Sequence, residues 1–252
     1  MTAVPLIGRE ARRLARNPVL WLVPVVVAVT SALDGARDGR NATYWYGTIF
    51  TAVAFFGPIF VLFAANLVAS GARRAGAEET LAVTPTAETR RTWAMCLGIA
   101  LPLGAAGAVA AGAMALVDAF APIAATDAQT AGELAQLPLI LTGAGLLGVL
   151  AARRLRFAGG VVIAFVLATL GGLVPFGKFA AGLWWMWWST ATPFEGRAAV
   201  PGEPWLHVVY LAGLCACAAV AAVYRDRRRL LLIGAPTLVA TLVVGWLQLQ
   251  LP

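Results

Sequence analysis

The chain has little charge and few reactive side chains: its 252 residues include three cysteines, one histidine and one lysine. Charged residues make up 12% of it, about half of what a soluble domain carries, and hydrophobic residues make up 60%. High hydrophobicity with low charge excludes an intrinsically disordered chain and argues against a soluble enzyme. The composition therefore predicts a polytopic membrane protein.

Residues that carry enzyme chemistry are scarce and scattered. Cys96, Cys215 and Cys217 lie in apolar stretches and are too few for a secreted disulfide framework. Cys215 and Cys217 would point in different directions on a helix, which makes them a poor metal site. A phosphate-binding loop, a zinc-protease motif and a nucleophile elbow are all missing from the sequence. We expect no catalytic, cofactor or metal site in this chain.

The net charge of +7 and the isoelectric point of about 10.2 come almost wholly from arginine. A soluble protein with this charge would be a candidate for nucleic-acid binding. In a membrane protein, arginines that set the topology and contact anionic lipid are the better explanation. We therefore expect membrane lipid as a partner and no nucleic acid.

Apolar runs without charge locate the membrane spans, since a helix needs about 20 apolar residues to cross a bilayer. The candidate runs are Pro18–Leu33, Asn41–Ala72, Thr92–Val117, Leu134–Ala152, Phe157–Gly177, Pro204–Tyr224 and Leu230–Pro252. The sequence predicts an all-α polytopic helix bundle of six to seven transmembrane helices. Residues 18–252 form the transmembrane domain, and residues 1–17 precede it.

Basic residues alternate along this pattern of spans. Fifteen arginines lie on one side of the membrane: before the first run, and in the loops that follow runs two, four and six. Only four basic residues lie in the loops on the opposite side. Because cytoplasmic loops are enriched in Lys and Arg, this predicts a cytoplasmic N-terminus.

The N-terminal segment has two faces at helical spacing. The basic face consists of Arg9, Arg12, Arg13 and Arg16, and the other consists of Ile7, Ala11 and Leu14. Pro18 disfavours helical geometry at Asn17, so the helix should break there. We expect an amphipathic helix in the cytoplasmic interface; a plain basic leader that only sets topology is the alternative.

The loop of residues 71–91 is the most informative cytoplasmic segment. It predicts a short amphipathic helix from about Ala75 to Val83, followed by a restart in which Thr84 is the N-cap and Pro85 the first helical residue. Such an element between two spans suits docking to a soluble partner. The residues predicted to make that contact are Glu78, Glu79, Thr80, Leu81, Val83, Thr84 and Pro85.

The outer segment of residues 172–203 is rich in tryptophan. Gly171, Gly172 and Pro175 should end the fifth span early, so part of this segment could re-enter the membrane before the sixth span. The tryptophans, which we expect to form an outer aromatic anchor at headgroup level, are Trp184, Trp185, Trp187 and Trp188.

Polar residues in and beside the spans are few, and the functional candidates among them are Asn66, Asp118 and His207. Ionisable groups within a membrane are functional candidates by default. Asp118 and His207, however, lie near the outer ends of their spans, where water is close.

Taken in order, these segments resemble the permease subunits of type-2 ATP-binding-cassette (ABC) exporters. The similarity rests on Gly8–Pro18, which is like the family's interfacial elbow helix, and on Ala75–Pro85, which is like its coupling helix. The family usually has six spans, so the seventh run here is a departure from its pattern.

The resemblance implies a permease in the bacterial cytoplasmic membrane that moves a hydrophobic or amphipathic substrate. Its partners would be ABC ATPase subunits, which bind ATP and Mg, and a second permease subunit, identical or different. Two other functions stay open: a non-catalytic membrane anchor of another complex, and a membrane enzyme acting on lipid through His207 or Asp118.

Overall fold

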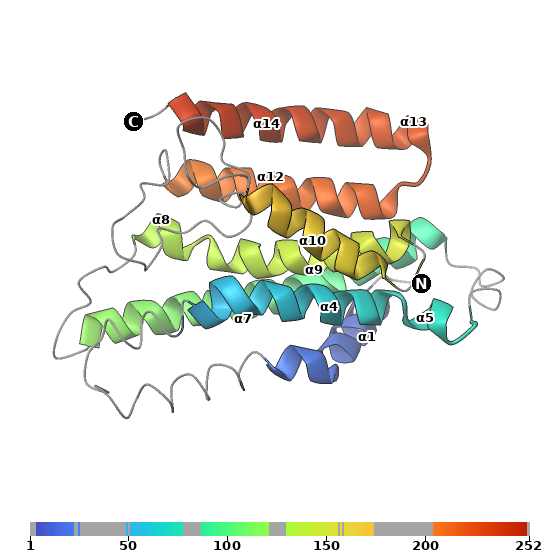
Figure 1. Ribbon diagram of the computed structural model, residues 1–252, viewed down its shortest axis with the longest axis horizontal. Coiled ribbons are helices and arrows are strands. Elements are labelled where there is room, and N and C mark those ends of the chain that lie inside the picture. The colour runs from blue at the N-terminus through green and yellow to red at the C-terminus, as the bar shows by residue number, and fades with distance from the viewer. Residues whose placement is uncertain are drawn as a thin grey trace.

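The computed structural model describes residues 4–22, 25, 49, 51–77, 87–120, 130–155, 157, 159–173 and 204–250. Every regular element in these residues is a helix, as the sequence predicts. The longer helices lie roughly alongside one another in a bundle, with α10 crossing it obliquely (Figure 1). The protein is thus an all-α helix bundle of the polytopic membrane class.

Five helical stretches of the described residues are long and apolar enough to cross a membrane. They are Ala52–Ala69, Glu88–Phe120, Ala131–Arg154, Pro204–Val223 and Arg227–Gln248. They correspond to the second, third, fourth, sixth and seventh predicted spans. The count is below the predicted six to seven, because the first span lies mostly outside the described residues and the helix of the fifth has 14 residues, Gly160–Leu173.

The N-terminal region forms α1 (Val4–Ala15) and the short 3-10 helix η1 (Pro18–Trp21). The predicted break between them is confirmed: Asn17 is extended, with φ −76° and ψ 120°, and its side-chain oxygen accepts a hydrogen bond from Val19 N at 3.0 Å. The residue before a proline avoids helical geometry, and asparagine is a favoured cap.

The next elements are the π-helix η2 (Thr51–Phe56), α4 (Gly57–Ala69) and α5 (Gly71–Arg74). They are followed by α7 (Glu88–Phe120), which extends past the predicted third span at both ends. A capping box between Thr130 and Glu133 starts α8 (Ala131–Leu134), which leads into α9 (Leu137–Arg154).

The remaining elements are α10 (Gly160–Leu173), α12 (Pro204–Val223), α13 (Arg227–Arg229), the π-helix η3 (Leu230–Gly234) and α14 (Ala235–Gln250). Helix α9 is central, because α4, α7 and α12 all pack against it. Helix α14 packs on α12 at the edge of the bundle (Figure 1).

Small residues let the central helices approach closely. A Cβ on Gly148 of α9 would lie 2.4 Å from the carbonyl oxygen of Leu62 on α4, and one on Gly107 of α7 would lie 2.5 Å from Cα of Pro138 on α9. Membrane helices associate through such contacts, since lipid offers no hydrophobic driving force between them.

Candidate functional site

The arginine-rich end of the bundle is the candidate site. Helices α4, α9 and α12 end here and α7 begins here (Figure 1). Arginines that are far apart in the sequence therefore lie at one end of the bundle. The predicted contact residues Glu78, Glu79, Thr80, Leu81, Val83, Thr84 and Pro85 lie outside the described residues. The flanks of that segment are described. The predicted helix from about Ala75 is wrong at its start, because α5 ends at Arg74 and Gly76 has a φ of 65°, which ends a helix. Ala87 is not helical and α7 begins at Glu88, so no helix runs from Pro85 into α7.

Helix α1 packs across this end of the bundle. Leu14 is 1% exposed within the main core, whereas Arg9, Arg12, Arg13 and Arg16 are exposed. A Cβ on Gly98 of α7 would lie 2.7 Å from the carbonyl oxygen of Ile7, so α1 lies directly on the backbone of α7. The arginines therefore line the open side of α1.

The same helix reaches the start of the predicted cytoplasmic loop. Arg13 pairs with Glu10 at 3.1 Å, and its Nη2 atom lies 2.7 Å from where a Cβ on Gly71 would stand. Gly71 begins α5, at the head of residues 71–91. The N-terminal helix and the loop are thus neighbours in space.

Arginine side chains also donate to backbone carbonyls at the ends of neighbouring helices. Arg73 Nη1 donates to Ala152 O at 2.9 Å. Arg154 donates to Ala221 O at 2.8 and 3.0 Å and to Tyr224 O at 2.6 Å. The last carbonyls of a helix have no partner within it and carry partial negative charge, so a guanidinium is favourable there.

Glu88 supplies the carboxylate of this arrangement. Its Oε1 atom pairs with Arg153 Nη2 and with Arg225 Nη1, the latter at 3.3 Å. Arg225 Nη2 also donates to Arg153 O at 3.1 Å. We refer to Arg73, Glu88, Arg153, Arg154 and Arg225 as the arginine cluster.

The sequence analysis did not identify this cluster. It treated these arginines as determinants of topology and did not single out Glu88. The sequence does contain a signal for these charged helix ends. Arg153 and Arg154 lie on the last turn of one span and Glu88 lies on the first turn of another, where their charges are favourable to the helix dipole.

The opposite end of the bundle holds a neutral polar contact. His207 and Gln248 are both 0% exposed, and His207 Nδ1 lies 3.1 Å from Gln248 Nε2 and 3.2 Å from its Oε1. The Tyr210 ring stacks on His207, with ring centroids 5.9 Å apart. His207 therefore links α12 to α14: it lies near the end of its helix, as expected, with its side chain buried within the protein.

The other polar residues of the spans also bind backbone or neighbouring helices. Asn66 donates to Gly148 O at 3.2 Å, which joins α4 to α9. Cys215 lies 3.5 Å from Leu139 O and Cys217 lies 3.7 Å from Thr241 Oγ1, so the two thiols point apart as predicted. Within the described residues, no group of three or more potential metal ligands comes together.

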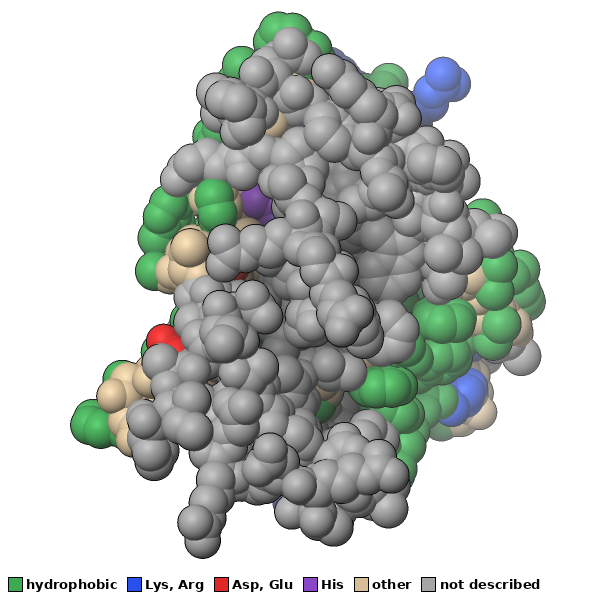
Figure 2. Space-filling model, turned by 60° about the vertical axis from the view of Figure 1, so that its left-hand side comes forward, with side chains coloured by type: hydrophobic (Ala, Val, Ile, Leu, Met, Phe, Trp, Pro, Cys, Tyr) green, Lys and Arg blue, Asp and Glu red, His purple; other side chains and the backbone are tan. Residues whose placement is uncertain are grey.

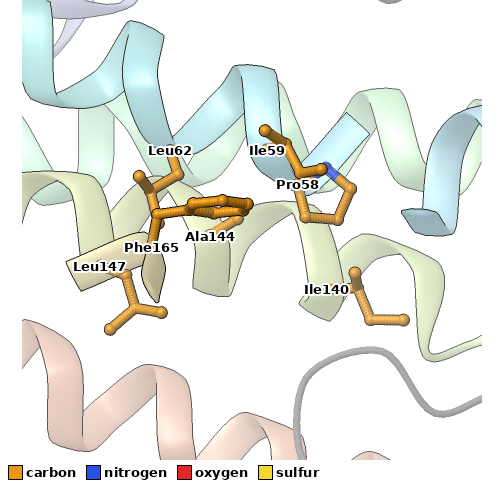
Figure 3. Close-up of a pocket in the computed structure, with 7 residues that line it drawn as sticks. All are labelled: Pro58, Ile59, Leu62, Ile140, Ala144, Leu147 and Phe165. Carbon is orange, nitrogen blue, oxygen red and sulfur yellow. The ribbon is translucent and has the colours of Figure 1, made fainter. Parts of the chain in front are cut away.

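A small apolar pocket lies between α4, α9 and α10. Figure 3 shows Phe165 of α10 beside Leu62 and Ala144, with Pro58 and Ile59 farther along α4. The face shown in Figure 2 likewise has mostly hydrophobic side chains where it is coloured. These surfaces suit lipid contact.

The outer aromatic anchor, Trp184, Trp185, Trp187 and Trp188, falls outside the described residues, as does the predicted re-entrant part of residues 174–203. Asp118 lies on the last turn of α7. No family model matches the chain, and no curated protein or solved structure is similar to it.

Proposed function

We propose that this protein is the permease subunit of an ABC exporter. The observation that supports the proposal is the packing of α1 against the start of α5 and against α7, the two helices nearest to residues 78–86 in the chain. Arg13 lies against Gly71 on the leading flank, and Ile7 lies on α7, which starts from the trailing flank. An interfacial helix beside a short loop between two spans is the arrangement that a docked ATPase needs in order to move the spans.

In this proposal the arginine-rich end faces the bacterial cytoplasm, because arginine-rich loops stay inside. ATP and Mg belong to separate ATPase subunits, and a second permease, identical or different, completes the complex. Leu81 enters a pocket on the ATPase, while Glu78 and Glu79 pair with basic residues at its rim. Buried apolar anchors dominate such interfaces, and rim charges contribute less.

The cargo is hydrophobic or amphipathic in this proposal. The described helices present large aliphatic and aromatic side chains outward, among them Leu101, Leu167 and Trp246. A cargo that partitions into the bilayer can reach such a surface without crossing a polar vestibule.

Purification of the tagged chain with its ATPase tests the proposal. We expect a stoichiometric ATPase in the wild-type preparation and its loss in Leu81→Asp, with Glu78→Ala as the matched rim control that loses less. Both variants should insert normally. Full ATPase binding by Leu81→Asp would remove the loop from the interface, and a wild-type chain that recovers other subunits without an ATPase would favour a membrane anchor.

A further inference from the structure

Both flanks of residues 78–86 are attached to the same end of α9. On the leading side, Arg73 donates to the carbonyl of Ala152 at 2.9 Å. On the trailing side, Glu88 pairs with Arg153, the neighbour of Ala152 in the chain. Both attachments therefore reach the last turn of α9, a helix that α7 and α8 separate from this segment in the chain.

Helix α9 is placed to pass a displacement on to the rest of the bundle. It packs against α4, α7 and α12, and Gly145 and Gly148 bring it against side chains and backbone of its neighbours. Close-packed interiors do not absorb a shift locally, because there is no free space for side chains to move into. A pull on the end of α9 must therefore move α9 as a unit or break its contacts.

The pair of Glu88 and Arg153 lies at the boundary between protein and solvent. The Arg153 side chain is 20% exposed and the Glu88 side chain is 50% exposed, so the guanidinium is partly shielded from water and the carboxylate is half covered. Arg225 binds Glu88 and also the carbonyl of Arg153, which adds the end of α12 to the same junction. Two guanidinium groups fix the orientation of the Glu88 carboxylate, and a side chain that transmits movement between helices needs a fixed orientation.

We infer that Glu88 and Arg153 are positioning residues that transmit a displacement of the start of α7 to α9. The inference rests on the proposed function, since an ATPase must supply the movement. Without the pair, a displacement of the start of α7 would act on α7 alone. The ion pair connects this movement to α9, and Arg225 connects it to α12.

The experiment measures movement of α8, which leads into the start of α9, relative to the end of α7, so no cargo is needed. Spin labels are placed on Ala119 at the end of α7 and on Ala131 at the start of α8, both exposed and far from the cluster, in a background with the three cysteines changed to alanine. The distance between the labels is recorded in the complex with its ATPase, with and without ATP and vanadate. ATP hydrolysis is measured on the same samples.

We expect ATP and vanadate to change the distance distribution in the otherwise unmodified chain. Glu88→Gln should reduce the shifted population severalfold while ATPase binding and basal hydrolysis persist. The matched control is Glu10→Gln, which removes the same charge from the other glutamate–arginine pair, at 3.1 Å on α1. That control should leave the distance change intact.

Two results would overturn the inference, and they are distinguishable. If Glu88→Gln shows the full distance change, the pair is not the relay, although the proposed function stands. If the wild-type chain binds no ATPase, the proposed function fails and the relay fails with it. Should Glu88→Gln not purify as a folded protein, Glu88→Asp keeps the charge on a shorter side chain, and an unreduced distance change in that variant likewise counts against the relay.

Discussion

Helices α9 and α14 are alike in apolar character and opposite in their surroundings. The stretches that contain them have mean hydropathies of 1.9 and 2.2. The most apolar part of the first stretch is 61% buried within the protein, whereas that of the second is 11% buried. One is the centre of the bundle, and the other is an edge helix whose outer face is covered by no other described helix.

The difference lies in side-chain size. The buried residues of α9 include Gly148, which lies against the backbone of α4, and Gly145, which lies against side chains of α7 and α4. Its last turn ends in Arg153 and Arg154. Helix α14 instead exposes Leu238, Val239, Leu242, Val243 and Trp246. Hydropathy does not separate a helix buried in protein from one bathed in lipid, whereas small residues at the contact do.

The largest effect should come from filling the closest approach on α9. In Gly148→Val, the new Cβ would lie 2.4 Å from Leu62 O and 3.0 Å from Asn66 N, both backbone atoms of α4. We expect a loss of about 3 kcal/mol of stability from overpacking, seen as loss of monodisperse protein after detergent extraction. Gly112→Val, at an open position of α7, is the control and should remain monodisperse.

A smaller effect is expected at the arginine end of α9. Arg154→Ala removes hydrogen bonds to Ala221 O and Tyr224 O, which join α9 to α12. Charged hydrogen bonds contribute about 1.5–3 kcal/mol, and exposure lowers this, so we expect about 1 kcal/mol and a lower unfolding temperature in detergent. Arg16→Ala, an exposed arginine on α1, should shift that temperature much less, and an equal shift would argue against the capping role.

The polar contact of α14 should have a modest and specific energy. A double-mutant cycle with His207→Ala and Gln248→Leu isolates the contact between α12 and α14. Buried hydrogen bonds between membrane helices average about 0.6 kcal/mol and reach about 1.7 kcal/mol. We expect a coupling energy within that range in reversible unfolding; additive single-variant effects would mean that the two side chains do not hold the helices together.

The smallest effect on the central bundle should follow removal of α14. A chain ending at Arg229 loses only a helix that packs on α12. It is made with His207→Leu, so that no buried imidazole is left facing lipid. On heating, the shortened chain should unfold at the same temperature as the full-length His207→Leu variant. A markedly lower unfolding temperature would show that α14 stabilises the central helices.

Much of the architecture follows from local chemistry. The apolar runs predicted the helical spans, and Asn17 with Pro18 predicted the break after α1, because these signals act within one turn of the chain. The bounds of α7 were less accurate, because α7 begins within the arginine-rich loop. The end of the fifth predicted span lies outside the described residues. Charged residues can continue a helix beyond the bilayer, so a charge does not mark a helix end.

The candidate site was harder to predict, since its parts come from distant segments. Glu88 and Arg153 are 65 positions apart, and Arg73 and Ala152 are 79 apart. No periodicity in the sequence connects such pairs. Only the packing of α9 against α4, α7 and α12 brings their ends together.

The sequence by itself determined that the chain is helical, that it is built for a membrane, and that its arginines alternate with its spans. These properties depend on composition and on spacing along one helix, which a bilayer sorts without reference to other helices. The tertiary structure alone decided which helix is central, that His207 joins α12 to α14, and that Glu88 faces Arg153. Those outcomes depend on which small residues meet across a helix contact, a relation between distant parts of the chain that no local pattern encodes.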